Sequence, residues 1–480
     1  MLTTRGIRGI LPPVLTKPNH PPVKERTRPL PHSPPRDQEP LLPGLRGIPP
    51  PPMHNEGSGD RQRWSEEHHL IVAALVALGL VAAIGLTTGA TPPANDGLHY
   101  LNVAEEGLVD NPRLAAPFAY RFGTPIIVRL VHRVTSLGVP DVFLIVALLS
   151  TWGTLIAAYL LARSVRATMA VSLAAMAAVA FSFFHVKFPL AVPTMVDVQG
   201  FLLIMLALWA LLKDRYGTCL VLSCLGIFFK EFLIVPALLI IVQKSRVFNH
   251  RRETVSLLWV LTTLCLAIAC FVIPRIAIPV TVGYGVNMRW DFGAPGHREY
   301  FEYLRYFLPG APDAGRLVNL CFALSSYWLP VLLLATPARM KDVWEDLSSL
   351  RLICMTHVSL VVLLALFGGT NIMIFVAYTV PVLVIVLVSL LRRGIHPAET
   401  AVALVALLLF NRIPFVMGGA ATTIDDLLRF YGGWWSRVDE VTAGRTLEIS
   451  GFILLLCVVR LITRRTAKSE SSEEVIRHPS

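Results

Sequence analysis

Charged residues are scarce in this sequence. Asp, Glu, Lys and Arg make up 16% of its 480 residues and hydrophobic residues make up 54%, whereas about a quarter of the residues in soluble domains are charged. The few charges lie in short clusters that separate apolar runs long enough to cross a bilayer. This pattern predicts an all-α fold, a polytopic bundle of transmembrane helices.

The motifs of several common soluble sites are absent as well. The sequence has no GxGxxG after a strand, no P-loop and no soluble domain large enough to hold a nucleotide. Its seven cysteines form no CxxC pair and have no His at zinc-ligand spacing, so we interpret them as packing residues. The net charge of +11 does not indicate a nucleic-acid partner, because most Lys and Arg lie just beyond helix ends, as the positive-inside rule predicts.

Residues 1–63 form a proline-rich segment with ten Lys/Arg against five Asp/Glu. Such a segment buries too little apolar surface to offset its chain entropy, so it predicts a disordered, basic cytosolic tail. Its PxxP patches leave open a role in docking a partner. The segment lacks the apolar run of a secretory signal peptide, and Met53 is an alternative to Met1 as the first residue.

Ten apolar runs follow the tail and predict roughly ten membrane-crossing helices. Arg61 and Arg63 precede the first run, which places the N-terminus in the cytosol and the loop from Thr91 outside the inner (plasma) membrane. With this orientation, the later clusters of Lys and Arg are expected in the cytosolic loops. The runs are 70–90, 142–162, 167–184, 198–212, 255–279, 317–336, 351–367, 371–391, 397–415 and 446–463.

One further apolar stretch, 217–243, is interrupted at its middle by Lys230 and Glu231. A single straight helix would hold both charges at mid-membrane and place the following basic cluster outside, at a cost of several kcal/mol. Two half-helices, 217–229 and 232–243, that enter and return on the cytosolic side avoid both violations. The sequence therefore predicts a broken or re-entrant hairpin that presents Lys230 and Glu231 to an outer, water-accessible cavity.

The segment 121–138 has apolar side chains such as Leu130 on one helical face and Arg129 and Arg133 on the other. This pattern predicts an interfacial helix on the outer membrane surface. The predicted organisation is a membrane module at 64–279, an outer loop at 280–316, transmembrane helices at 317–463 that include a second long outer loop at 416–445, and a cytosolic tail at 464–480.

Every polar candidate residue faces outward in this topology. The eight candidates are Asp96, Tyr100, Arg121, His185, Lys187, Asp197, Lys230 and Glu231. Structural explanations remain open for several of them. Asp96 fits a solvated surface acid, and Asp197 fits a carboxylate favoured by a helix N-terminus. Lys230 and Glu231 fit an ion pair that bridges the hairpin tip. Arg121 fits either a lipid-headgroup anchor or a phosphate ligand.

Four sequence stretches resemble bacterial members of the GT-C superfamily of membrane glycosyltransferases. The resemblance covers about residues 70–243, with a weaker echo at 368–383. Its motifs are DGLHY at 96–100, PFAYRFGTP at 117–125, MVDVQGFLLIMLALWALL at 195–212 and LSCLGIFFKEFLIVPALLI at 222–240. In that family an Asp opens one helix and a Lys-Glu or Arg-Glu pair breaks the next.

The resemblance implies transfer of a sugar from a polyprenyl-phosphate carrier to an acceptor on the extracytosolic side. Asp96 would then be the catalytic or metal-linked acid, which leaves a divalent cation open as a cofactor. Lys230 and Arg121 would face the lipid phosphate. A carboxylate that deprotonates an acceptor hydroxyl and cations that stabilise a departing phosphate suit this chemistry.

Two other functions remain open. A transporter or lipid flippase would use the broken helix at 217–243 as a substrate site, and a catalytically silent membrane scaffold would keep only the fold. Transporters commonly have internal repeats, and the absence of a clear repeat here favours the transferase. Beyond membrane lipid and the lipid-linked donor, the sequence predicts no partner.

Overall fold

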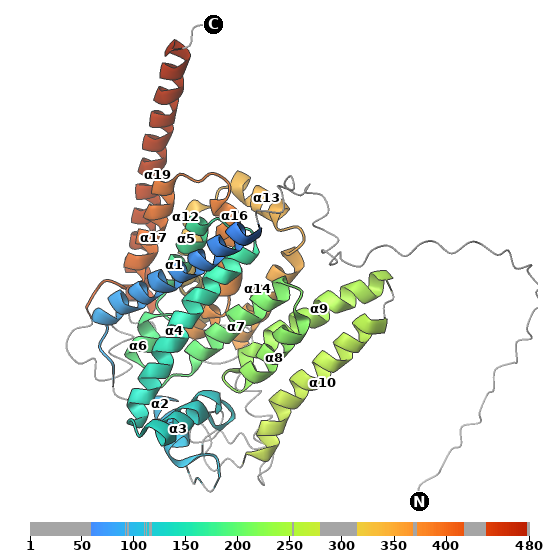
Figure 1. Ribbon diagram of the computed structural model, residues 1–480. Helices are drawn as coiled ribbons and strands as arrows, with labels where there is room; N and C mark the ends of the chain where they lie inside the picture. The colour runs from blue at the N-terminus through green and yellow to red at the C-terminus, as the bar shows by residue number, and fades with distance from the viewer. Residues whose placement is uncertain are drawn as a thin grey trace, which may run out of the picture. The chain divides into compact units, whose positions relative to one another are not determined.

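The computed structural model describes residues 59–278, 314–367, 372–416 and 438–477, apart from short gaps at 92, 94–95, 110, 112, 115–117 and 252–253. Throughout these residues the chain is helical and contains no strand (Figure 1). The predicted all-α, polytopic bundle is therefore confirmed.

Within the described ranges, five helices are long and apolar enough to cross a membrane. They are α1 (Gly59–Leu86), α4 (Val139–Ser164), α10 (Thr254–Ala277), α12 (Ala314–Leu334) and α19 (Val438–Arg477). Large apolar side chains cover their outer surfaces, including Leu258 and Ile273 on α10, which are more than half exposed. Such surfaces are stable against lipid tails and unfavourable in water, so the chain is a multi-pass membrane protein.

Two of the other five predicted spans, α7 (Asp197–Leu212) and α14 (Arg351–Phe367), match their predicted bounds to within one residue. The remaining three are shorter than predicted: α5 (Met169–Ala180), α16 (Val380–Leu391) and α17 (Pro397–Phe410). A helix of 12 residues reaches only about 18 Å, less than the hydrocarbon core. α14 forms a pair with α13 (Pro337–Asp346) that is bent by 111°. The apolar run at 371–391 is divided into α15 (Ile372–Ala377) and α16.

The predicted break at Lys230 and Glu231 is present. α8 (Tyr216–Ile227) ends before it, and η2 (Glu231–Leu233) leads into α9 (Ile234–Arg251), which runs past the predicted end at 243. Lys230 has extended backbone, with φ −158° and ψ 137°. A Cβ on Gly226 would lie 2.4 Å from the Leu233 side chain. Only glycine at this position therefore lets α8 and η2 approach each other this closely.

The predicted interfacial segment is α3 (Gly123–Thr135), which lies beside α2 (Asp96–Glu106) (Figure 1). Leu130 and Val134 are 63% and 78% exposed on its apolar face. On the polar face, Arg129 Nη1 donates to the backbone oxygen of Glu105 at 2.6 Å. An amphipathic helix with its polar side bound to protein and its apolar side exposed suits a membrane surface.

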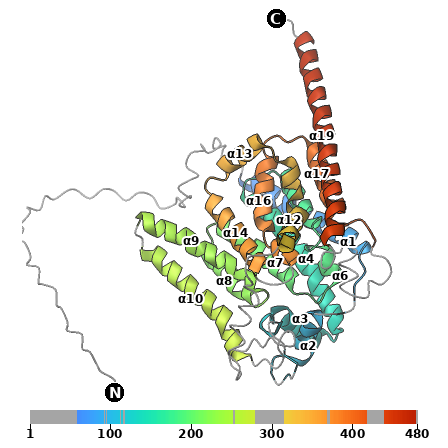
Figure 2. The same cartoon turned by 180° about the vertical axis from the view of Figure 1, so that it is seen from behind.

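The described basic loops gather at the end of the bundle opposite α2 and α3, where α13 lies (Figures 1 and 2). Arg392 Nη1 donates to the Val165 backbone oxygen at 3.1 Å, and Arg393 pairs with Asp346 of α13 at 3.5 Å. This arrangement fits the alternation of basic and polar loops that the positive-inside rule predicts.

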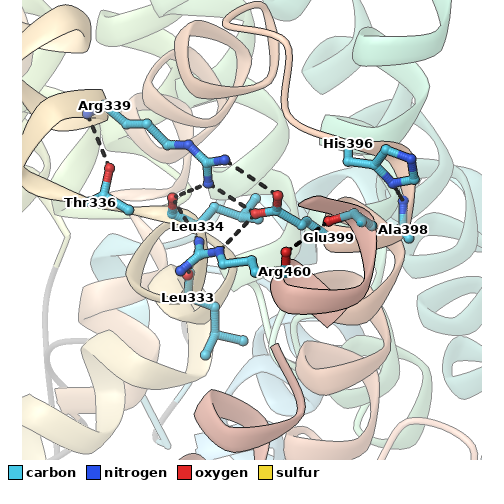
Figure 3. A network of polar contacts seen from close by, with 9 residues as sticks. Leu333, Leu334, Thr336, Arg339, His396, Ala398, Glu399 and Arg460 are labelled. Atoms are coloured by element: carbon cyan, nitrogen blue, oxygen red, sulfur yellow. Dashed lines mark hydrogen bonds and ion pairs between the residues drawn. The ribbon is translucent and has the colours of Figure 1, made fainter. Parts of the chain in front are cut away.

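A buried carboxylate joins three helices at this basic end (Figure 3). Glu399 of α17 accepts from Arg339 Nη1 at 3.0 Å and from Arg460 Nε of α19 at 2.9 Å. The same two arginines donate to backbone oxygens of Leu333 and Leu334 at the end of α12. Cations at a helix C-terminus satisfy its free carbonyl groups and interact favourably with its dipole. We interpret this network as a structural clamp.

Several predicted segments lie partly or wholly outside the described residues. Of the tail at 1–63, only 59–63 are described, and they belong to α1. The outer loops at 280–316 and 416–445 are described only at 314–316, in α12, at 416 and at 438–445, in α19. α19 continues to Arg477, so most of the predicted tail at 464–480 is helical.

Candidate functional site

Several helix ends and two helix breaks meet at the end of the bundle that holds α2 and α3. The first turns of α2 and α7 lie there with η1 (Phe118–Tyr120), the break between α8 and α9, and the end of α10. The Gly123 N–H donates to the Phe228 backbone oxygen at 2.9 Å. A Cβ on Gly123 would lie 2.8 Å from the Phe229 ring. The start of α3 is thereby fixed against the hairpin break.

Lys230 and Glu231 are adjacent in sequence but bind different partners. The Lys230 ammonium lies 2.7 Å from Asp197 Oδ1, an ion pair in which both side chains are buried. The Glu231 carboxylate instead accepts from Arg121 Nε, with both oxygens at 3.0 Å. Extended backbone directs successive side chains to opposite sides, and Lys230 is extended. The break therefore contributes one residue to each of two neighbouring ion pairs.

Glu231 has a second cationic neighbour, Arg275 at the end of α10, whose Nη2 lies 3.5 Å from its carboxylate. The Arg275 guanidinium also lies over the rings of Phe271 and Tyr120, with centroid distances of 3.6 and 5.1 Å. Arg121 Nη1 donates to the Tyr100 hydroxyl at 3.2 Å. The Arg121 and Arg275 guanidiniums thus share one carboxylate, and guanidiniums grouped in this way can bind an anionic ligand.

Asp96 opens α2 beside this cluster. The charges of Arg121, Lys230 and Asp197 all act on its carboxyl group. Burial raises the pKa of Asp96, and the two cations lower it by less than burial raises it. A Cβ on Gly97 would lie 2.3 Å from Thr194 Oγ1, so the first turn of α2 packs closely on the loop before α7. A half-buried carboxyl with a raised pKa is a better proton acceptor than a solvated Asp.

The cluster does not fit a resident divalent cation. Its three acids, Asp96, Asp197 and Glu231, lie among the three cations Arg121, Lys230 and Arg275, and two of the acids are already ion-paired. Within the described part of the chain, no three His, Cys, Asp or Glu side chains converge as metal ligands. Mg²⁺ and Ca²⁺ bind where carboxylate and carbonyl oxygens are in excess.

A second helix break faces the first. Between α15 and α16, the Tyr378 ring stacks on Phe232 of η2 with a centroid distance of 4.8 Å. Side chains from neighbouring helices bond to the interrupted backbone: His357 Nε2 lies 2.8 Å from the Tyr378 backbone oxygen, and Tyr327 donates to the Met373 oxygen at 2.8 Å. Non-helical backbone inside a membrane bundle is stable only when its polar groups are satisfied in this way.

Six of the eight predicted residues therefore lie in or beside one cluster, and two lie elsewhere. His185 shares a hydrogen bond of 2.8 Å with Ser182 and packs on the rings of Phe201 and Tyr327. The buried Lys187 ammonium donates to backbone oxygens of the segment that follows α17, including that of Phe415 at 2.7 Å. This position indicates that Lys187 ties α6 (Lys187–Ala191) to the segment after α17.

Sequence reasoning missed Arg275 and Tyr378. Arg275 is the one charged residue in the predicted span at 255–279, and an ionisable residue in an apolar span is rarely incidental. That signal was available. Tyr378 lay in the weaker echo of the family pattern, and nothing in the sequence distinguishes it from an ordinary core tyrosine. Comparison with protein-family models and with curated proteins gives no match.

Proposed function

We propose that this protein is a membrane glycosyltransferase that moves a sugar from a polyprenyl-phosphate carrier to an acceptor hydroxyl on the extracytosolic side of the membrane. The observation that supports this proposal is a half-buried carboxyl, Asp96, beside a guanidinium cluster at the end of the bundle away from the described basic loops. A base next to an anion-binding group is the combination that glycosyl transfer from a phosphate requires.

In the proposed reaction Asp96 takes the proton of the acceptor hydroxyl. The acceptor oxygen forms a bond to the anomeric carbon, and the bond between that carbon and the phosphate oxygen breaks. The polyprenyl phosphate leaves with the bonding electrons, and Arg121 and Arg275 stabilise its charge. Direct displacement inverts the anomeric centre. None of these steps requires a metal ion.

The donor-binding role of Arg121 gives the first prediction. In a transfer assay with the purified full chain and a labelled polyprenyl-phosphate sugar, Arg121→Gln should raise the donor KM by roughly 10- to 100-fold, the effect of losing hydrogen bonds to a charged group. The matched control is Arg113→Gln, since Arg113 lies in the same loop but is exposed and pairs only loosely with Glu106 at 3.6 Å. An unchanged KM in a folded Arg121→Gln protein would contradict the donor site.

Transport or flipping of a lipid phosphate is the second candidate function, and the two facing breaks favour it. The break at Lys230 and the break at Tyr378 meet through the stacked rings of Phe232 and Tyr378, and transporters bind substrates at paired interruptions of this kind. The test is whether the wild-type protein moves a fluorescent polyprenyl phosphate across the membrane of liposomes. Movement that occurs without sugar transfer and is lost in Arg121→Gln would favour transport over the transferase. A chain inactive in both assays would fit the silent scaffold.

A further inference from the structure

The hydroxyl group of Tyr378 is buried and has no hydrogen-bond partner among the described residues. Tyr378 has 0% of its surface exposed, and its hydroxyl makes no hydrogen bond to any described residue. A hydroxyl group in such a position has lost water and gained nothing in return, which destabilises the fold. Unpaired groups of this kind in native structures often belong to a site that is completed by a ligand.

The Tyr378 hydroxyl lies close to Asp197. Asp197 and Gly200 share one face of α7, since they are three residues apart. A Cβ on Gly200 would lie 2.4 Å from the Tyr378 hydroxyl oxygen, and the charge of Asp197 acts on that hydroxyl. Asp197 Oδ1 is ion-paired to Lys230, and Asp197 Oδ2 makes no hydrogen bond within the described residues. A hydroxyl donor and a carboxylate oxygen, neither of them hydrogen-bonded to a described residue, thus lie together.

The surroundings hold the Tyr378 ring in place. Phe232 and Phe201 lie on it with centroid distances of 4.8 Å each, and His357 bonds to its backbone oxygen. The hydroxyl group therefore has no freedom to move to another partner. Its position is set by the second helix break, because Tyr378 follows the last residue of α15.

We propose that the Tyr378 hydroxyl and the Asp197 carboxylate bind a hydroxyl group on the sugar ring of the lipid-linked donor. A sugar hydroxyl is both a donor and an acceptor, so it pairs with both groups at once: it donates to Asp197 and accepts from Tyr378. The aromatic side chains beside them provide the apolar surface that a sugar ring packs on. This inference rests on the proposed transferase function and adds the residues that recognise the sugar.

Two lipids test the proposal: a polyprenyl-phosphate hexose and the same polyprenyl phosphate without the sugar, each bound to the purified full chain in detergent. The wild-type protein should bind the hexose lipid more tightly than the bare lipid. Tyr378→Phe should weaken binding of the hexose lipid about tenfold, the effect of one lost hydrogen bond, and leave binding of the bare lipid unchanged. Its thermal stability should not fall, because the hydroxyl group makes no hydrogen bond to any described residue that the substitution could remove.

The matched control is Tyr159→Phe, which removes from α4 another buried hydroxyl group that has no hydrogen-bond partner in the described part of the chain. It should bind both lipids as the wild-type protein does. Equal binding of the two lipids by the wild-type protein, or an undiminished sugar preference in Tyr378→Phe, overturns the inference and leaves the phosphate site in place. Failure of the wild-type protein to bind either lipid overturns the proposed function, and this inference with it.

Discussion

Asp96→Asn is expected to lower the rate of sugar transfer by about 10²- to 10⁴-fold, the usual contribution of a general base. Asn keeps the size and polarity of Asp but accepts no proton at the reacting oxygen. The purified variant should remain folded and should still bind the donor, since Arg121 and Arg275 are intact. The loss should therefore appear in kcat, with a smaller change in the donor KM.

The pH profile adds a second readout for Asp96. Burial raises the pKa of this carboxyl, and the base acts only when it is deprotonated. The rate should therefore fall as the pH is lowered, with a midpoint above the usual range of Asp. Glu105→Gln is the matched control, because Glu105 is an exposed acid on the same helix. Full activity of folded Asp96→Asn would remove Asp96 from the base role.

Lys230→Met should destabilise the protein by about 3–5 kcal/mol, the usual effect of removing one partner of a buried ion pair. Lys230 and Asp197 are almost fully buried and 2.7 Å apart, so the variant leaves an uncompensated carboxylate inside the bundle. Lys230→Met combined with Asp197→Asn removes that charge and should recover most of the lost stability. The measurement is the free energy of unfolding in mixed micelles.

An exposed lysine provides the control for this prediction. Lys213 lies at the C-terminal end of α7, whereas Asp197 begins that helix, and the Lys213 side chain is exposed. Lys213→Met should therefore alter the free energy of unfolding by less than about 0.5 kcal/mol. Lys230→Met as stable as the wild-type protein, or a double variant as unstable as the single one, would show that the pair is not an internal electrostatic contact.

The features that could be predicted from the sequence are those where charged residues interrupt or flank an apolar run. Charges in the apolar stretch at 217–243 predicted the helix break because a buried, unpaired charge is very costly. The two-sided pattern at 121–138 likewise predicted α3. Both signals are local, so they can be read without knowledge of the rest of the fold.

Features that depend on long-range contacts were not predictable in the same way. An ion pair between Lys230 and Glu231 was one of the alternatives that the sequence left open, whereas Lys230 pairs with Asp197 of α7 and Glu231 pairs with Arg121, which lies just before α3. The run at 371–391 was predicted to span the membrane, yet it is interrupted at Tyr378, where donors from α12 and α14 satisfy the backbone. Hydropathy reports apolar composition and contains no information on such hydrogen bonds.

The position of the donor phosphate tests the central claim most directly. A polyprenyl phosphate with a photoreactive group beside its phosphate would be cross-linked to the full chain in liposomes and the labelled peptides mapped by mass spectrometry. We predict labelling at 96–106, 118–123 and 228–233, competed by unlabelled donor and lost in Arg121→Gln. Labelling confined to the basic end, at 337–346 or 392–397, would contradict the proposed site.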